Sequence, residues 1–149
     1  MITGDWGNPK RIWGLEETYD AGRMIQIYEA IRDLPITSII DVACGTGIIA
    51  DGLAWTRKWD VYQFDIEQYP EWKHLDVIPV KMDVMDFIKI DKSYDLVMFL
   101  NAYRNWDEKP RSMFDEWLKR NAKYFITSDG KGEAIGKDVK GHTLTLEKL

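Results

Sequence analysis

Residues 41–50, DVACGTGIIA, limit what this chain can fold into more than any other stretch does. They continue an apolar run that starts at Ser38 and is typical of a buried strand. Gly45 and Gly47 then allow backbone angles that other residues avoid, so we expect a tight turn whose backbone a ligand can approach closely. The small and apolar residues that follow predict a helix from Gly47 to about Arg57.

Helical and strand-like patterns alternate along the rest of the chain. An apolar face at helical spacing predicts a helix over about residues 16–33, and its members are Met24, Ile27, Tyr28 and Ile31. Another helix is expected around Pro110, because proline suits the first turn of a helix. Runs that are typical of strands occupy residues 38–43, 60–65, 77–82, 94–100, 122–128 and 143–147.

This alternation predicts an α/β fold. We expect a Rossmann-like three-layer sandwich, in which helices cover both faces of a mostly parallel central sheet. Residues 143–147 alternate polar and apolar side chains, and we expect them to form an antiparallel C-terminal strand. With 149 residues the chain has room for one core and not for two, so residues 1–149 are expected to form a single domain.

The composition is that of an ordinary globular protein, with 45% hydrophobic and 30% charged residues. The longest apolar run, residues 96–100, is far too short to span a membrane. Cys44 is the single cysteine, so we expect no disulfide framework, no metal site and a reducing, cytoplasmic location. The net charge of −5 argues against unspecific nucleic-acid binding, although the segment from Lys119 onward is mildly basic.

Three acids coincide with the ends of three successive strands. Asp41 lies within the first apolar run, where a carboxylate without a partner is costly. Asp65 ends the second strand, and an acid there can accept hydrogen bonds from ribose hydroxyls. Asp83 ends the third strand. Each acid alone is more often explained by a surface turn or a helix cap, but together with the glycine loop they favour a nucleoside site.

The same segments resemble four motifs of the class I S-adenosylmethionine-dependent methyltransferases. Asp41-Val-Ala-Cys-Gly-Thr-Gly47 is similar to the first motif, D-x-G-x-G-x-G, with Ala43 in place of its first glycine. Phe64-Asp65-Ile66 resembles the second motif, Met82-Asp83-Val84 the third, and residues 93–97, SYDLV, the entry to the fourth strand. The resemblance covers residues 36–128, and it divides the chain into an N-terminal segment and helix (1–35), a cofactor-binding core (36–128) and C-terminal strands (129–149).

This resemblance implies S-adenosyl-L-methionine as the cofactor, with the methionine part held by Asp41 and by the backbone of residues 43–47. Asp65 would bind the ribose with Ile66 against the adenine, while Asp83 and the Val84 amide would face the adenine edge. Asn101 would lie near the methionine end or the acceptor. The implied cofactor-binding residues are Asp41, Ala43, Cys44, Gly45, Thr46, Gly47, Asp65, Ile66, Asp83, Val84 and Asn101.

The acceptor side is less defined. Residues 100–104, LNAYR, lack the signature of methylases that act on DNA adenine, so the acceptor stays open among small molecules, proteins and nucleic acids. Asn101, Tyr103 and Arg104 are the candidates closest to it, although Tyr103, like Trp106, is more often explained by packing under the next helix. The N-terminal aromatic residues are either a lid over the site or core filler, and they are Trp6, Trp13 and Tyr19.

No catalytic pair stands out in the sequence. His74 and His142 are interpreted as surface residues, and Cys44 as a small packing residue rather than a nucleophile. Methyl transfer needs alignment more than acid–base chemistry, because the leaving group belongs to the cofactor.

The expected function is therefore a small methyltransferase with an unidentified acceptor. The first alternative is a cofactor-binding sensor or a partner subunit without activity of its own, and assembly into a homo- or hetero-oligomer fits the small size. The second alternative is an NAD-dependent oxidoreductase, because residues 45–50 fit the dinucleotide spacing G-x-G-x-x-G/A. Asp41 counts against this second alternative, since a pyrophosphate disfavours a nearby carboxylate.

Overall fold

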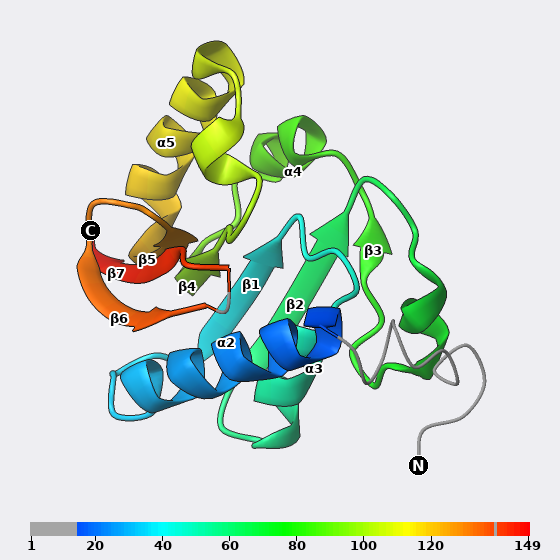
Figure 1. Ribbon diagram of the computed structural model, residues 1–149. Coiled ribbons are helices and arrows are strands. Elements are labelled where there is room, and N and C mark those ends of the chain that lie inside the picture. Colours follow the sequence, from blue (N-terminus) through cyan, green and yellow to red (C-terminus); the bar gives the residue numbers. More distant parts are fainter. Residues whose placement is uncertain (1–14, 139) are drawn as a thin grey trace.

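The computed structural model describes residues 15–138 and 140–149. A seven-stranded sheet runs through its centre in the order β3-β2-β1-β4-β5-β7-β6 (Figure 1). The strands are β1 (Ser38–Val42), β2 (Asp60–Asp65), β3 (Val80–Lys81), β4 (Tyr94–Met98), β5 (Ala122–Ser128), β6 (Glu133–Lys137) and β7 (Thr143–Lys148).

Strands β1 to β5 are parallel to one another, whereas β7 runs antiparallel to both β5 and β6. The carboxyl ends of the first five strands therefore meet at one edge of the sheet. This arrangement confirms the prediction of a Rossmann-like α/β fold with an antiparallel strand at the C-terminal end.

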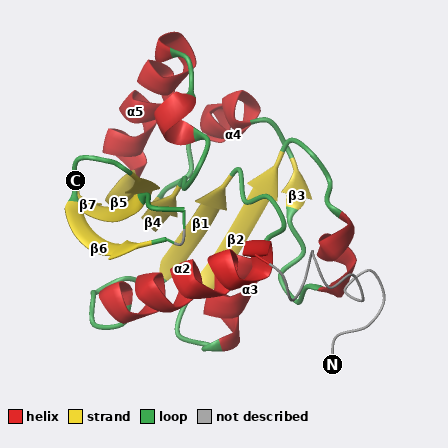
Figure 2. Ribbon diagram, viewed as in Figure 1, coloured by secondary structure: helices red, strands yellow, loops and turns green. Residues whose placement is uncertain are grey.

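Helices cover both faces of the sheet, as Figure 2 shows: α2 and α3 lie on one face, and α4 and α5 on the other. The α-helices are α2 (Leu15–Ile31), α3 (Ile48–Trp55), α4 (Val84–Ile90) and α5 (Glu108–Asn121). Two short 3₁₀ helices, η2 (Pro70–His74) and η3 (Tyr103–Asn105), follow β2 and β4. None of the helices in the described residues is long and apolar enough to cross a membrane.

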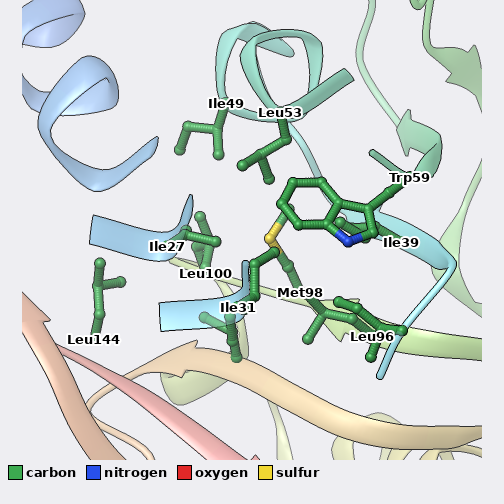
Figure 3. Packing of buried hydrophobic residues seen from close by; sticks show 12 residues of the cluster. Ile27, Ile31, Ile39, Ile49, Leu53, Trp59, Leu96, Met98, Leu100 and Leu144 are labelled. Atoms are coloured by element: carbon green, nitrogen blue, oxygen red, sulfur yellow. The ribbon is translucent and has the colours of Figure 1, made fainter. Parts of the chain in front are cut away.

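Each face of the sheet buries its own apolar cluster. On the α2 side, Ile27 and Ile31 meet Leu53 of α3 and side chains of β1 and β4 (Figure 3). The predicted apolar face of the first helix is thus confirmed, and burial of each such side chain contributes roughly 1.5–3 kcal/mol. On the α5 side the cluster is largely aromatic, with Phe114 stacked edge-on against Phe99 at 5.2 Å between ring centroids.

Asp95 connects neighbouring strands at the amino-terminal edge of the sheet. Asp95 of β4 reaches the residue before β1, where its Oδ2 accepts hydrogen bonds from Thr37 N at 2.7 Å and from Thr37 Oγ1 at 2.9 Å. Lys123 Nζ lies 3.2 Å from Asp95 Oδ1. These donors, first among them the Thr37 amide, lower the pKa of Asp95 to about 2.

Three elements differ from what the sequence predicts. The strand expected at residues 77–82 is shorter, because the Val77 backbone is bound by side chains: Asp51 Oδ1 accepts from its amide and Gln63 Nε2 donates to its carbonyl. The helix α4 was not expected, and neither was β6, whose residues lie between segments that read as turns.

Candidate functional site

The loop between β1 and α3 is built on alternating left-handed backbone angles. Ala43, Gly45 and Gly47 have φ angles of 55°, 61° and 80°. Glycine adopts such angles freely, but for alanine the left-handed region costs roughly 1–2 kcal/mol. Ala43 therefore stores strain at the position where the methyltransferase motif has a glycine. Strain of this kind is found mostly at functional sites.

The two glycines of the loop serve different purposes. A Cβ atom on Gly47 would lie 2.7 Å from Leu75 Cδ1 and 3.0 Å from the Gln63 amide, so this residue is a glycine for packing. A Cβ on Gly45 would meet nothing within 4 Å. The loop is consequently tight at the α3 end and open at Gly45, where a ligand can lie against the backbone.

Asp65 and Trp72 hold this loop in place. Gly45 N donates to Asp65 Oδ2 at 2.8 Å, and Glu67 N donates to Asp65 Oδ1 at 3.0 Å. The Trp72 indole donates to the Gly45 carbonyl at 2.8 Å. Asp65 is 8% exposed, and each of its oxygens has a second lone pair that can accept from a ligand hydroxyl.

Asp41 lies at the end of β1 with 2% of its surface exposed. Burial raises its pKa to about 8, against the opposing effect of the Arg23 guanidinium. The nearby carboxylates of Asp20 and Asp65 raise it further. A buried carboxyl in this position ionises readily only when a cation arrives, so the site is suited to a positively charged group.

Asp83 and Ile66 complete the row along this edge of the sheet. Asp83 is half-buried and caps α4, since its Oδ1 accepts from Met85 N at 2.9 Å. Val84 is the first residue of that helix. Ile66 follows β2 directly and is 57% exposed. The structure thus brings Asp41 of β1, Asp65 of β2 and Asp83, two residues after β3, to the same edge of the sheet.

Helix α2 adds charged groups that the sequence interpretation missed. Arg23 is 4% exposed and donates from Nη1 to Asn101 Oδ1 at 2.9 Å and from Nη2 to Asp20 Oδ1 at 2.6 Å. Thr46 Oγ1 donates to Asp20 Oδ2 at 3.3 Å. The signal in the sequence was spacing: Arg23 precedes Ile27 and Ile31 by four and eight residues, so it belongs to the inward face of the helix.

Cys44 packs beside Trp72 and Leu75 in a small apolar cluster. Burial raises the pKa of its thiol, and the carboxylates of Asp41 and Asp65 raise it further. A thiol that stays protonated is a poor nucleophile, which supports the interpretation of Cys44 as a packing residue.

The residues after β4 divide between packing and polar contacts. The Tyr103 hydroxyl donates to Asp115 Oδ1 at 2.6 Å, and its ring packs against Phe99 and Phe125. Burial is the main reason why the pKa of Tyr103 is raised. Trp106 also packs on Phe99, so both aromatic residues lie under α5, as their packing interpretation predicts.

Arg104 points to a different group, at the end of β5. Its Nη2 lies 3.1 Å from His142 Nε2, and its Nε lies 3.9 Å from Asp129 Oδ2. His142 Nδ1 lies 2.9 Å from the same Asp129 oxygen. The Thr143 amide and then His142 lower the pKa of Asp129. His142 is therefore part of a polar cluster, whereas His74 is exposed on η2 as expected.

Two expectations concern other parts of the chain. Trp6 and Trp13, and the side chain of Tyr19, lie outside the described residues, so the choice between lid and core filler stays open. Within the described residues no group of three or more His, Cys, Asp or Glu side chains is arranged to hold a metal ion.

Solved structures share this architecture. A methyltransferase from Archaeoglobus fulgidus that depends on S-adenosylmethionine matches 80% of the chain with a TM-score of 0.63 and 18% identity. The methyltransferase domain of bacterial CtHen1 matches 74% with a TM-score of 0.58 and 15% identity. The plantazolicin methyltransferase BpumL, solved with S-adenosylhomocysteine and a substrate analogue, matches 74% with a TM-score of 0.54 and 16% identity.

The chain has the class I methyltransferase fold. Its strand order and the antiparallel β7 distinguish this fold from the dinucleotide-binding Rossmann fold, in which strands 1 to 6 are all parallel. The chain spans 55%, 66% and 47% of the lengths of the three proteins named above, in that order. No protein-family model and no curated protein matches the sequence.

Proposed function

We propose that this chain is a small S-adenosylmethionine-dependent methyltransferase. The observation that carries the proposal is the row of three acids, Asp41, Asp65 and Asp83, beside the strained glycine loop at one edge of the class I methyltransferase fold. Carboxylates suit a cofactor that carries a sulfonium, an ammonium and a ribose. A dinucleotide with its pyrophosphate would be repelled by the same groups.

The nucleoside half of the cofactor fits the β2 and β3 side of the site. Asp65 accepts hydrogen bonds from the ribose hydroxyls through its second lone pairs, while its Gly45 and Glu67 contacts keep it oriented. The exposed Ile66 side chain would contact the adenine. Asp83, whose Oδ1 is engaged with the Met85 amide, faces the adenine amine with Oδ2.

The methionine half fits the β1 and β4 side. Asp41 takes the ammonium group, which explains why a buried carboxyl with a raised pKa is kept there. Arg23, held by Asp20 and Asn101, supplies a positive charge for the carboxylate of the amino acid. The open face of Gly45 lets the cofactor lie against the backbone.

When bound, the cofactor supplies an activated methyl group with its own leaving group. The residues of the chain bind and orient it, and they hold the acceptor in line with the methyl carbon near Asn101. Positioning of this kind accounts for much of the rate enhancement in group transfer.

The test is isothermal titration of the protein with S-adenosylmethionine and S-adenosylhomocysteine. Both should bind, and Asp65→Ala should weaken binding by roughly tenfold or more, because charge-assisted hydrogen bonds to the ribose are lost. Asp60→Ala is the matched control, since it removes an exposed acid from the other end of β2. If neither compound binds at tens of micromolar, or if both variants behave alike, the proposal is wrong.

Titration in two buffers with different ionisation enthalpies tests Asp41 separately. The pKa of about 8 predicts that cofactor binding at pH 7 releases a proton, as the ammonium draws Asp41 into its charged form. Asp41→Asn should abolish this proton release. Binding with no buffer dependence would contradict the role of Asp41, although not that of Asp65.

A second candidate function is cofactor binding without catalysis, as a sensor or as a subunit of a larger enzyme. The chain spans 47–66% of the solved methyltransferases named above, so their whole activity is not carried over to it. Methyl transfer to any member of a broad acceptor panel by the isolated chain would exclude it. Transfer that appears only when a second protein is added would support it.

A further inference from the structure

A groove of about 530 Å³ runs between α5 and the β5–β7 face of the sheet, away from the row of acids. A groove of this volume is within the range of small-molecule sites. Four cationic side chains line it: Arg104, Arg111, Lys119 and Lys131. Three carboxylates line it as well: Asp115, Asp129 and Glu147.

Two of these three acids are already occupied by neutral donors. Asp115 accepts from the Tyr103 hydroxyl, and Asp129 accepts from Thr143 N at 3.0 Å as well as facing His142. In the part of the chain that the structure describes, Arg111, Lys119 and Lys131 make no ion pair. Of the four cations only Arg104 pairs with an acid among the described residues, with its Nε 3.9 Å from Asp129 Oδ2, so the acids of the groove take up its positive charge only in part.

Arg104 is the best-placed of these cations, because two residues hold it. A guanidinium only donates, so His142 Nε2 accepts from Nη2 and the imidazole is neutral, with its proton on Nδ1 directed to Asp129. His142 itself is fixed by the β6–β7 turn, where its amide donates to Asp138 Oδ1 at 3.0 Å. Asp129 and His142 are thus positioning residues for Arg104.

One nitrogen of Arg104 stands out. Its Nη1 is buried, and no hydrogen-bond acceptor lies within reach in the part of the chain that the structure describes. A buried donor without a partner is costly, and native structures rarely keep one unless a ligand satisfies it. An oxyanion in the groove, a phosphate or a carboxylate, supplies the acceptor, and Arg104 binds such groups with its planar fork of donors.

The Arg104 end of the groove adjoins the end of β4. Ser128 N donates to the Leu100 carbonyl at 3.1 Å, which places Asp129 beside Asn101 at the carboxyl edge of the sheet. This is the edge where the transferable methyl group lies in the proposed function. We propose that the groove binds the methyl acceptor and that the acceptor is a small molecule with a phosphate or carboxylate group, held by Arg104. This inference rests on the proposed function.

The test is a nuclear magnetic resonance titration without cofactor, using inorganic phosphate and, in a second arm, succinate. Ionic strength is held constant with sodium chloride. The chain has only two histidines, so the ring signals of His142 and His74 are readily separated. We expect saturable shifts at His142 and none at His74, and the stronger of the two arms identifies the preferred oxyanion.

Variants connect this signal to Arg104. Arg104→Ala should weaken binding roughly tenfold to hundredfold, and Arg104→Lys should lie in between, because it keeps the charge and loses the fork. Arg120→Ala, which removes an exposed arginine of α5 outside the groove, should bind like the parent protein. If Arg104→Ala does not fold, Arg111→Ala and Lys131→Ala replace it, and each should weaken binding.

Absence of saturable shifts in both arms would overturn the inference, and so would equal binding by the Arg104 and Arg120 variants. Because no cofactor is present, this failure differs from failure of the proposed function. If the protein binds S-adenosylmethionine but neither oxyanion, the proposed function stands and the inferred acceptor class is wrong. If it binds oxyanions at Arg104 but no cofactor, the proposed function is wrong and the groove is an anion site.

Discussion

The two ends of β1 lie against acids whose environments are opposite. At the amino end, Asp95 accepts from Thr37 and contacts Lys123, and its pKa is lowered to about 2. At the carboxyl end, Asp41 is buried and its pKa is raised to about 8. The comparison separates a carboxylate that stabilises the fold from one that is costly without a ligand. Asp95 is stabilised by donors of the chain, whereas the buried Asp41 stays protonated until a cation arrives.

Replacement of Asp41 gives the largest expected effect. Since the folded protein holds this proton up to about pH 8 and the unfolded chain loses it near pH 4, stability falls as pH rises between these values. Asp41→Asn removes this loss and should stabilise the free protein by on the order of 4 kcal/mol at pH 8, with a much smaller gain at pH 4. Urea denaturation across this range measures the difference.

The same substitution should also weaken cofactor binding, because the amide cannot neutralise an ammonium group. A more stable protein that binds the cofactor more weakly would be the signature of a residue kept for its ligand. If Asp41→Asn destabilises at pH 8, the contrast between the two ends of β1 is broken.

Gly47→Ala tests the backbone of the loop that follows the carboxyl end of β1. The new Cβ would combine a left-handed φ of 80° with a 2.7 Å approach to Leu75, so we expect a loss of about 3 kcal/mol. Gly141→Ala is the control, because Gly141 has a φ of 90° but open space around it. That variant should lose only about 1 kcal/mol, and thermal denaturation of both variants should preserve this order.

Asp95→Asn tests the structural end. The folded pKa of about 2 lies below the unfolded value near 3.8, so the stabilising contribution is complete above pH 4 and is lost as pH falls through 2. We expect the variant to lose about 2 kcal/mol at pH 7 and to approach the parent protein below pH 3. Cofactor affinity should not change. A parallel decrease in affinity would mean that the two ends of β1 do not act independently.

Ala43→Gly should have the smallest effect. It relieves the left-handed φ of 55° but gives the unfolded chain more freedom, so we expect a gain of at most about 1 kcal/mol. Equilibrium denaturation at pH 7 resolves a change of this size. A clear destabilisation would show that the Ala43 methyl group, which packs on the α5-side cluster, matters more than the strain.

Much of the fold was predictable because its strands are apolar and its loop depends on glycine. Residues 122–128 were expected as a strand and form β5 with those bounds. The helix α4 was missed because Val84, Phe87 and Ile88 favour strands locally, while the Asp83 cap and burial of Phe87 decide for a helix. Strand β6 was missed because few of its side chains are buried and it exists through pairing with β7.

The site divides in the same way. Asp41, Asp65 and Asp83 were predictable, since each lies at or near the carboxyl end of a strand that its apolar neighbours mark in the sequence. Arg23 and the cluster of Arg104 with Asp129 and His142 were not, because tertiary contacts bring them together from distant segments. The local sequence predicts backbone constraints well. It does not predict contacts between side chains that are 38 residues apart, such as Arg104 and His142.

Cys44 lies in the loop between β1 and α3, so the rate of its chemical modification depends on how often this loop opens. It is the only thiol of the chain and lies half-buried between the strained backbone and the Trp72 ring. The thiol is only partly exposed, so we expect opening of this segment to speed its modification by a thiol reagent. Comparison of the modification rate with and without a ligand shows whether binding closes the loop, without any engineered label.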